Sequence, residues 1–81
     1  MVDIRIEYIK SLGFTRDKVD DGWDRYERSV GNQTTYIGHD KTNDEFKMSS
    51  KGSFINIFTE SANVEEYKLF RRKYIIKSIL G

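Results

Sequence analysis

The sequence predicts a single α+β domain in which two terminal helices pack against a four-stranded antiparallel meander, in the order α-β-β-β-β-α. Three observations predict this fold class. Both ends of the chain carry apolar residues at helical spacing, the middle carries short alternating segments, and polar turns of two to four residues separate those segments. With 81 residues, we expect one small domain spanning residues 1–81.

The two helices are expected at about residues 3–12 and 64–80. Asp3 is a suitable N-cap for the first helix, and Gly13 is a suitable C-terminal stop. The second helix is apolar on nearly all sides, so it needs contacts on more than one side. We expect it either to be wedged between the sheet and the first helix or to complete its core in a second chain, as a homodimer.

Four strands are expected in the middle of the chain, after a charged loop at residues 15–22. Their sequences are GWDRYERSV, QTTYIGHD, EFKMSS and SFINIF, at residues 22–30, 33–40, 45–50 and 53–58. Residues 31–32 and 51–52 fit two-residue hairpin turns, and residues 41–44 fit a four-residue loop. These turn lengths fix the register of the strands, and with it the face on which each side chain lies.

This register gives the sheet two unlike faces. The first is mainly aliphatic and should pack against a helix; it carries Tyr26, Val30, Ile37, His39, Phe46, Met48, Ile55 and Ile57. The second combines aromatic and polar side chains; it carries Trp23, Arg25, Tyr36, Lys47, Phe54, Asn56 and Phe58. The second face is either core beneath a helix, an anchor for a protein partner, or a stacking platform for single-stranded nucleic acid. Acidic residues on the same face, Glu27, Asp40 and Glu45, disfavour phosphate binding.

Nucleic-acid binding is the alternative function that the charge pattern raises. The stretch KLFRRKYIIK at residues 68–77 is basic, but the whole chain has 14 basic and 13 acidic side chains and a net charge of only +1. In a helix, Arg71, Arg72, Lys73 and Lys77 spread around the axis and do not form the continuous basic stripe of a nucleic-acid helix. Binding through these four residues, or through the aromatic face, therefore ranks below protein binding.

The sequence shows no motif for catalysis, for metal binding or for nucleotide binding. There is no cysteine, His39 is the single histidine, and neither a GxSxG turn nor a glycine-rich phosphate loop occurs. The run DKVDDGWD offers Asp17 and Asp21 to an EF-hand loop, but Val19 and Arg28 stand where ligands are needed. We expect no enzyme, no cofactor and no metal site.

The chain also lacks an apolar run of membrane-spanning length and a signal peptide, so a cytoplasmic location without membrane contact is expected.

One family resemblance covers residues 9–40. The segments IKSLGF, GWDRYER and YIGHD resemble the HicA-type toxin ribonucleases, in which a helix ending in a Gly-aromatic pair precedes a hairpin with a Gly-Ser-His motif. This chain has Gly22-Trp23-Asp24 at the motif, so the family's catalytic histidine is absent. The long fourth strand and the final helix also depart from the family's pattern, and the resemblance does not imply ribonuclease activity for this chain.

The sequence thus favours a small non-enzymatic protein-binding module, such as an inhibitor, adaptor or accessory factor. Trp23, Tyr36 and Phe54 would be its anchors, and Arg25 would orient the partner. Small αβ proteins of this kind are common among the accessory proteins of phages and mobile elements, and that analogy suggests a similar origin here. A second copy of the chain, bound through the final helix, is the other expected partner.

Overall fold

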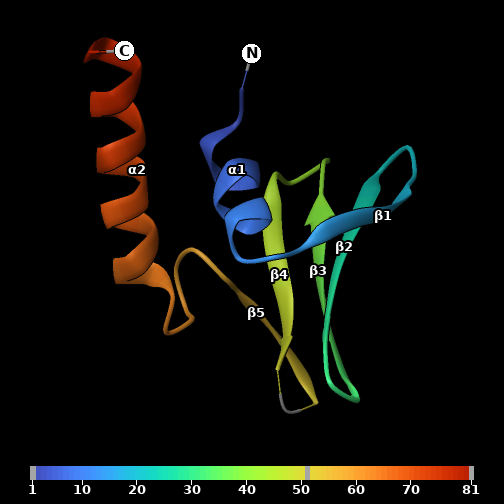
Figure 1. Ribbon diagram of the computed structural model, residues 1–81. Coiled ribbons are helices and arrows are strands. Elements are labelled where there is room, and N and C mark those ends of the chain that lie inside the picture. Colours follow the sequence, from blue (N-terminus) through green and yellow to red (C-terminus); the bar gives the residue numbers. More distant parts are fainter. Residues whose placement is uncertain (1, 51, 81) are drawn as a thin grey trace.

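The computed structural model describes residues 2–50 and 52–80 and contains one antiparallel sheet and two helices (Figure 1). In chain order the elements are α1 (Ile4–Ser11), β1 (Thr15–Val19), β2 (Trp23–Val30), β3 (Gln33–Asp40), β4 (Glu45–Ser50), β5 (Ser53–Asn56) and α2 (Val64–Leu80). Each strand pairs with the next one in the sequence, so the sheet is a meander in the order β1-β2-β3-β4-β5. The predicted α+β class, with one helix before and one after an antiparallel sheet, is confirmed.

The sheet has five strands and not the expected four, because residues 15–22 are not simply a loop. Their first part forms β1, which pairs antiparallel with β2 and contains a bulge at Asp17. All five residues of β1 are exposed. A strand that buries no side chain does not need alternating apolar and polar residues, so the sequence pattern does not reveal it. Backbone pairing at the sheet edge holds it in place, and its charges and bulge protect that edge from pairing with other chains.

The predicted register of the other four strands is confirmed. On the aliphatic face, one cross-strand row contains Tyr26, Ile37, Met48 and Ile55. On the opposite face, the neighbouring row contains Arg25, Gly38, Lys47 and Asn56. Gly31 takes the left-handed φ of +61° that the first hairpin turn requires. In the second predicted turn, at residues 51–52, Lys51 lies outside the described residues.

Helix α1 covers the aliphatic face, and its two ends are capped as predicted. The Asp3 carboxylate accepts a hydrogen bond from the Arg5 backbone N–H at 3.0 Å. At the other end Gly13 has φ +95°, and the Phe14 N–H donates to the Ile9 carbonyl at 3.3 Å, which turns the Phe14 ring toward the sheet. The buried core contains Ile9, Phe14, Tyr26, Ile37, Phe46 and Ile57.

Helix α2 lies on the far side of α1, so α1 separates it from the sheet (Figure 1). The expected wedge of α2 between the sheet and α1 is therefore not observed. Tyr8 of α1 joins the two helices: its ring centroid lies 5.4 Å from that of Tyr67 and 5.3 Å from that of Phe70, and its hydroxyl accepts a hydrogen bond from the Asn63 amide at 3.2 Å. Neither helix, as far as the chain is described, combines the length and the apolar character needed to cross a membrane.

Candidate functional site

The sheet surface turned away from α1, which we call the outer face, carries most of the predicted binding residues. Trp23, Arg25, Tyr36, Lys47 and Phe54 all lie on it, as the strand pairing places them. Both helices lie on the opposite side of the sheet, so no described helix covers the outer face (Figure 1). Trp23 is 49% exposed, Tyr36 38% and Phe54 70%, which rules out the expectation that these aromatic side chains are core beneath a helix.

Gly38 shapes the centre of the outer face. The Trp23 ring lies so close that a Cβ built on Gly38 would be 2.6 Å from Cζ3 and 3.0 Å from Cε3 of the indole. Trp23, Gly38 and Phe54 together line two neighbouring hollows of about 460 Å³ and 350 Å³. Tyr36 and Arg25 border the larger hollow, and Lys47 borders the smaller one. The Trp23 ring thus lies over Gly38, and together with Phe54 it forms the aromatic walls of a groove on the outer face, which we call the Gly38 groove.

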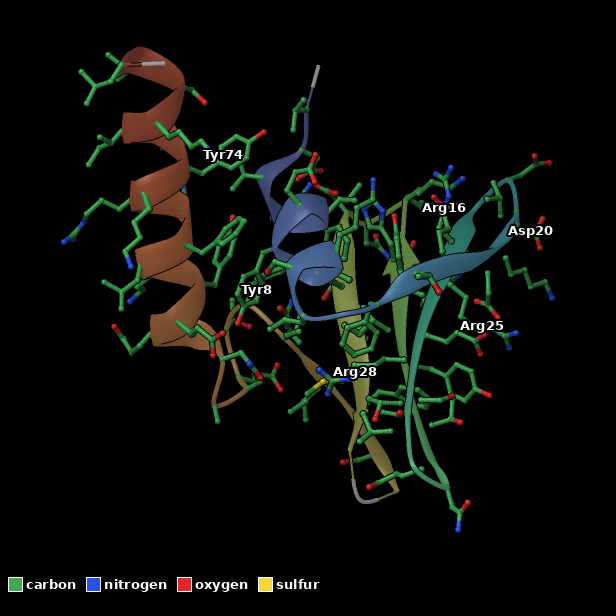
Figure 2. The ribbon with its side chains drawn as sticks, viewed as in Figure 1. Tyr8, Arg16, Asp20, Arg25, Arg28 and Tyr74 are labelled. Atoms are coloured by element: carbon green, nitrogen blue, oxygen red, sulfur yellow. The ribbon has the colours of Figure 1, made fainter. Side chains whose placement is uncertain are left out.

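Arg25 is held in place on two sides. Its guanidinium carbon lies 5.0 Å from the centre of the Tyr36 ring, and its Nη2 lies 2.7 Å from Oδ2 of Asp17 on β1. Hydrogen bonds from Arg25 lower the pKa of the Asp17 carboxyl, and the same contacts raise the pKa of Arg25. The side chain points away from both helices (Figure 2). The bulged strand β1, absent from the expected sheet, therefore supplies the carboxylate that fixes Arg25.

Phe58 does not lie on the outer face, and its assignment to that face is wrong. The last strand ends at Asn56, whose side-chain oxygen accepts a hydrogen bond from the Phe58 N–H at 2.9 Å. This turn breaks the alternation, and the Phe58 ring packs on the inner side, with its centroid 5.2 Å from that of Phe46 and 4.5 Å from that of Tyr67. Phe58 therefore belongs to the packing between the sheet and the helices.

The basic residues predicted for nucleic acid are not brought to the outer face. Arg71, Arg72, Lys73 and Lys77 are exposed on α2, on the other side of the sheet. The outer face itself has mixed charge, with Lys47 Nζ 4.0 Å from a Glu45 carboxylate oxygen. The two sets of residues considered for nucleic acid therefore do not form one surface.

A second polar cluster, which the sequence did not reveal, lies where α1 begins. Arg5 donates hydrogen bonds to Asp3 at 2.9 Å and to Asp44 at 3.0 Å and 3.1 Å, while His39 Nε2 lies 3.0 Å from Asp44 Oδ1. The His39 ring is nearly buried and stacks on Phe46 with the ring centroids 3.9 Å apart. Hydrogen bonds from Arg5 lower the pKa of both carboxyls. Arg5 and Asp44 are 39 positions apart, so no local pattern could have predicted their contact.

This cluster ties the start of α1 to the turn between β3 and β4. Its charged groups are already paired with one another, and Arg5 also covers the Phe46 ring, with its guanidinium carbon 4.8 Å from the ring centre. Among the residues that the structure describes, no group of three or more His, Asp or Glu side chains is arranged to hold a metal ion. The cluster of Asp3, Arg5, His39 and Asp44 therefore joins two parts of the fold, and we call it the clasp.

Comparisons of the chain with protein-family models, with curated proteins and with solved structures return no match.

Proposed function

We propose that this protein is a small non-enzymatic binding module that holds a protein partner on the outer face of its sheet. The observation that carries the proposal is the exposure of Trp23, Tyr36 and Phe54 together on a face that no described helix covers. Exposed aromatic side chains that gather on one surface are unusual for a surface in contact with water alone. Their grouping around the Gly38 groove favours insertion of apolar side chains from a partner.

The residue types of the outer face suit a protein more than a nucleic acid. Trp, Tyr and Arg are the side chains that contribute most to protein interfaces, and here each comes from a paired strand that restricts its motion. The Arg25 guanidinium, which borders the larger hollow, already has the Asp17 carboxylate as its partner. Glu27, Asp40 and Glu45 add negative charge on the same face, which would repel phosphates.

The outer face supports binding and offers little for catalysis. Around the groove, Arg25 is paired with Asp17, and the buried Asp24 lies 3.0 Å from Lys41 Nζ, so both groups are already engaged within the chain. An acid–base reaction would need a titratable pair aimed at a bound substrate. We therefore propose that the protein is an inhibitor, adaptor or accessory factor. By analogy alone, we also propose a phage or mobile-element origin.

The experiment that tests the proposal is affinity capture from native lysate followed by direct titration with the captured protein. Wild type should retain a partner, and the double variant Trp23→Ala with Tyr36→Ala should lose it. Val19→Ala, which alters an exposed apolar residue on β1, is the matched control and should retain it. Because Trp23 is the only tryptophan, its fluorescence should change during the titration with wild type.

Two results would contradict the proposal. One is a partner that the double variant binds as tightly as wild type does. The other is the absence of any captured protein together with binding to single- or double-stranded nucleic acid that weakens steeply with salt, which would favour the alternative function. In that case, charge-removing variants of Arg71, Arg72, Lys73 and Lys77 should reduce the slope of affinity against salt.

A further inference from the structure

A polar cavity of about 440 Å³ opens between α1 and the edge strand β1, on the inner side of the sheet. Asp3, Glu7 and Lys10 line it along α1, where a spacing of three or four residues places them on one side of the helix. Arg16 lines it from β1 and Tyr26 from β2, and these two residues pair across the strands. The sheet separates this cavity from the outer face, since Tyr26 belongs to the core beneath α1.

The Tyr26 hydroxyl is a buried polar group that the fold does not use. The residue is 1% exposed, and its hydroxyl has no hydrogen-bond partner in the described chain. Burial raises the pKa of this hydroxyl, the charge of Asp24 raises it further, and nearby Arg16 acts in the opposite direction. Buried polar groups are normally paired, because an unpaired one costs free energy. Tyr26 therefore holds a protonated donor at the cavity without a partner of its own.

The charged side chains along α1 differ in how they are paired. Both carboxylate oxygens of Asp3 accept hydrogen bonds from Arg5, so this charge is already engaged in the clasp. Within the described residues, the side chains of Glu7 and Lys10 form no hydrogen bond and no ion pair. Helix α1 thus presents one carboxylate and one ammonium group to the cavity, and neither is engaged by the described chain.

Arg16 adds a second cation from β1. Its Nη1 lies 3.9 Å from Oδ2 of the buried Asp24, too far for a hydrogen bond, while Oδ1 of Asp24 lies 3.0 Å from Lys41 Nζ. The Arg16 side chain is 54% exposed and points to the opposite side of β1 from Arg25 (Figure 2). A side chain held so loosely can turn toward an anion in the cavity, and the neighbouring Tyr26 hydroxyl can then donate to the same anion.

These free groups select the charge of a ligand. Lys10 and Arg16 offer two cations and Glu7 offers one carboxylate, so a ligand that pairs with all three carries two negative charges and one positive charge. We propose that the cavity binds an acidic α-amino acid of the glutamate or aspartate type. One ligand carboxylate accepts hydrogen bonds from Arg16 and from the Tyr26 hydroxyl. The ligand ammonium group donates to Glu7, and the second carboxylate pairs with Lys10.

The proposal does not depend on a partner at the outer face. None of Glu7, Lys10, Arg16 and Tyr26 borders the Gly38 groove. A few convergent polar groups around a cavity of several hundred Å³ are typical of a small-molecule site. The two faces of the sheet therefore offer two different kinds of site, one for a protein and one for a small charged molecule.

Other ligands fit this lining less well. Inorganic phosphate or a simple dicarboxylate would pair with Arg16 and Lys10 but would bring its negative charge close to Glu7. A metal ion would meet two cations, and the described chain offers no group of three or more acidic or histidine side chains to hold it. An apolar molecule would leave the Tyr26 hydroxyl and the charged groups without partners.

Titration of the isotope-labelled full chain with L-glutamate, followed by NMR, tests the proposal. Backbone amide shifts near Glu7, Lys10, Arg16 and Tyr26 should change and reach saturation. Tyr26→Phe should weaken binding at least about tenfold, because it removes a hydrogen bond to a charged group. The Tm of this variant should equal or exceed that of wild type, because the hydroxyl has no partner in the folded chain. A hydroxyl that served the fold alone would instead lower Tm when removed.

Ligand selectivity provides a second measurement that does not depend on a core substitution. Glutarate has the two carboxylates of glutamate but no ammonium group, so wild type should bind it more weakly. Glu7→Gln should remove this preference, and Arg16→Gln should weaken the binding of both ligands. Lys18→Gln, which removes a β1 cation outside the cavity, is the matched control and should bind glutamate as wild type does.

The variant Trp23→Ala with Tyr36→Ala separates this site from the outer face. It should lose the protein partner and keep its affinity for glutamate, because neither side chain lines the cavity. Loss of glutamate binding in this double variant would contradict a separate site on the inner side of the sheet.

Clear outcomes would overturn the proposal. One is the absence of saturable L-glutamate binding at millimolar concentration, and another is binding that Tyr26→Phe leaves unchanged. A clearly lower Tm in Tyr26→Phe would assign the hydroxyl to the fold and not to a ligand. Wild type that binds glutarate or inorganic phosphate as tightly as glutamate would make the cavity a simple anion site and reject the amino-acid class.

Discussion

The indole ring of Trp23 lies against Gly38 on the neighbouring strand, at a distance that leaves no room for a side chain at position 38. Glycine inside a strand weakens the strand by itself, and its presence often marks the close approach of another group. An aromatic ring that covers such a glycine replaces the missing packing. Trp23 thus packs against the neighbouring strand although half of its surface is exposed.

Replacing Gly38 with alanine should displace Trp23. The added Cβ would be 2.6 Å from the ring, so the indole must move outward into solvent. We expect the fluorescence of this single tryptophan to shift to longer wavelength, and the affinity for the protein partner to fall. Gly22→Ala is the matched control, because beyond its two chain neighbours a Cβ there meets only Thr42 Oγ1, at 3.9 Å. An unchanged emission spectrum in Gly38→Ala would show that Trp23 does not depend on Gly38.

Replacing Gly13 with alanine should destabilise the fold through the end of α1. Gly13 has φ +95°, a conformation that alanine adopts only with strain, and it permits the turn that directs Phe14 into the core. We expect a loss of about 1 kcal/mol in the free energy of unfolding, or a decrease in Tm of roughly 4–8 °C for a domain of this size. Thermal denaturation followed by circular dichroism measures the change. Gly22→Ala, at a glycine without positive φ, should leave Tm nearly unchanged.

The central strands and the final helix could be predicted with the bounds that the structure shows. β3, β4 and α2 coincide with the expected residues 33–40, 45–50 and 64–80. Their signals are local, since alternation or helical spacing runs through each segment and short polar turns bound the strands. The lengths of the turns then fixed the register between neighbouring strands. This register correctly placed Trp23 and Tyr36 on the outer face.

The remaining features depend on contacts that sequence patterns do not encode. β1 has no apolar alternation because it lies exposed at the sheet edge, held by its pairing with β2. Phe58 turned inward because the Asn56 side chain accepts a hydrogen bond from its N–H and the strand ends two residues earlier than expected. The Asp17 carboxylate that holds Arg25 comes from the strand that was expected to be a loop. In each case a hydrogen bond between specific groups outweighed the simple periodic pattern.

Removing the Tyr8 hydroxyl should loosen α2 and leave the sheet intact. Tyr8→Phe keeps the ring contacts with Tyr67 and Phe70 but leaves the Asn63 amide without this acceptor. We expect a cost of about 1 kcal/mol. Hydrogen exchange should become faster at the start of α2 while the central strands keep their protection. Tyr36→Phe, which removes a hydroxyl on the outer face, should change neither region, and faster exchange throughout the sheet in Tyr8→Phe would contradict this assignment.

The cluster of Asp3, Arg5 and Asp44 should make the fold sensitive to acid. Hydrogen bonds from Arg5 lower the pKa of both carboxyls below the ordinary value of 3.8 in the folded chain, and His39 contributes at Asp44. The unfolded chain therefore binds protons at a higher pH than the folded chain does, so this contribution to stability is complete above pH 3.8 and is lost as pH falls through the folded values. Chemical denaturation at a series of pH values measures the effect.

The variant Asp44→Asn isolates the contribution of that carboxylate. Asp44 has φ +54°, and asparagine tolerates this left-handed conformation well, so the substitution removes the charge with little backbone strain. We expect the variant to be less stable than wild type at neutral pH and the difference to shrink as pH falls below 3.8, because wild-type Asp44 then becomes protonated too. Asp21→Asn, which removes an exposed carboxylate outside the cluster, is the control and should match the stability of wild type at neutral pH. A difference between Asp44→Asn and wild type that stays constant across the acidic range would mean that the clasp acts through its shape and not through its charge.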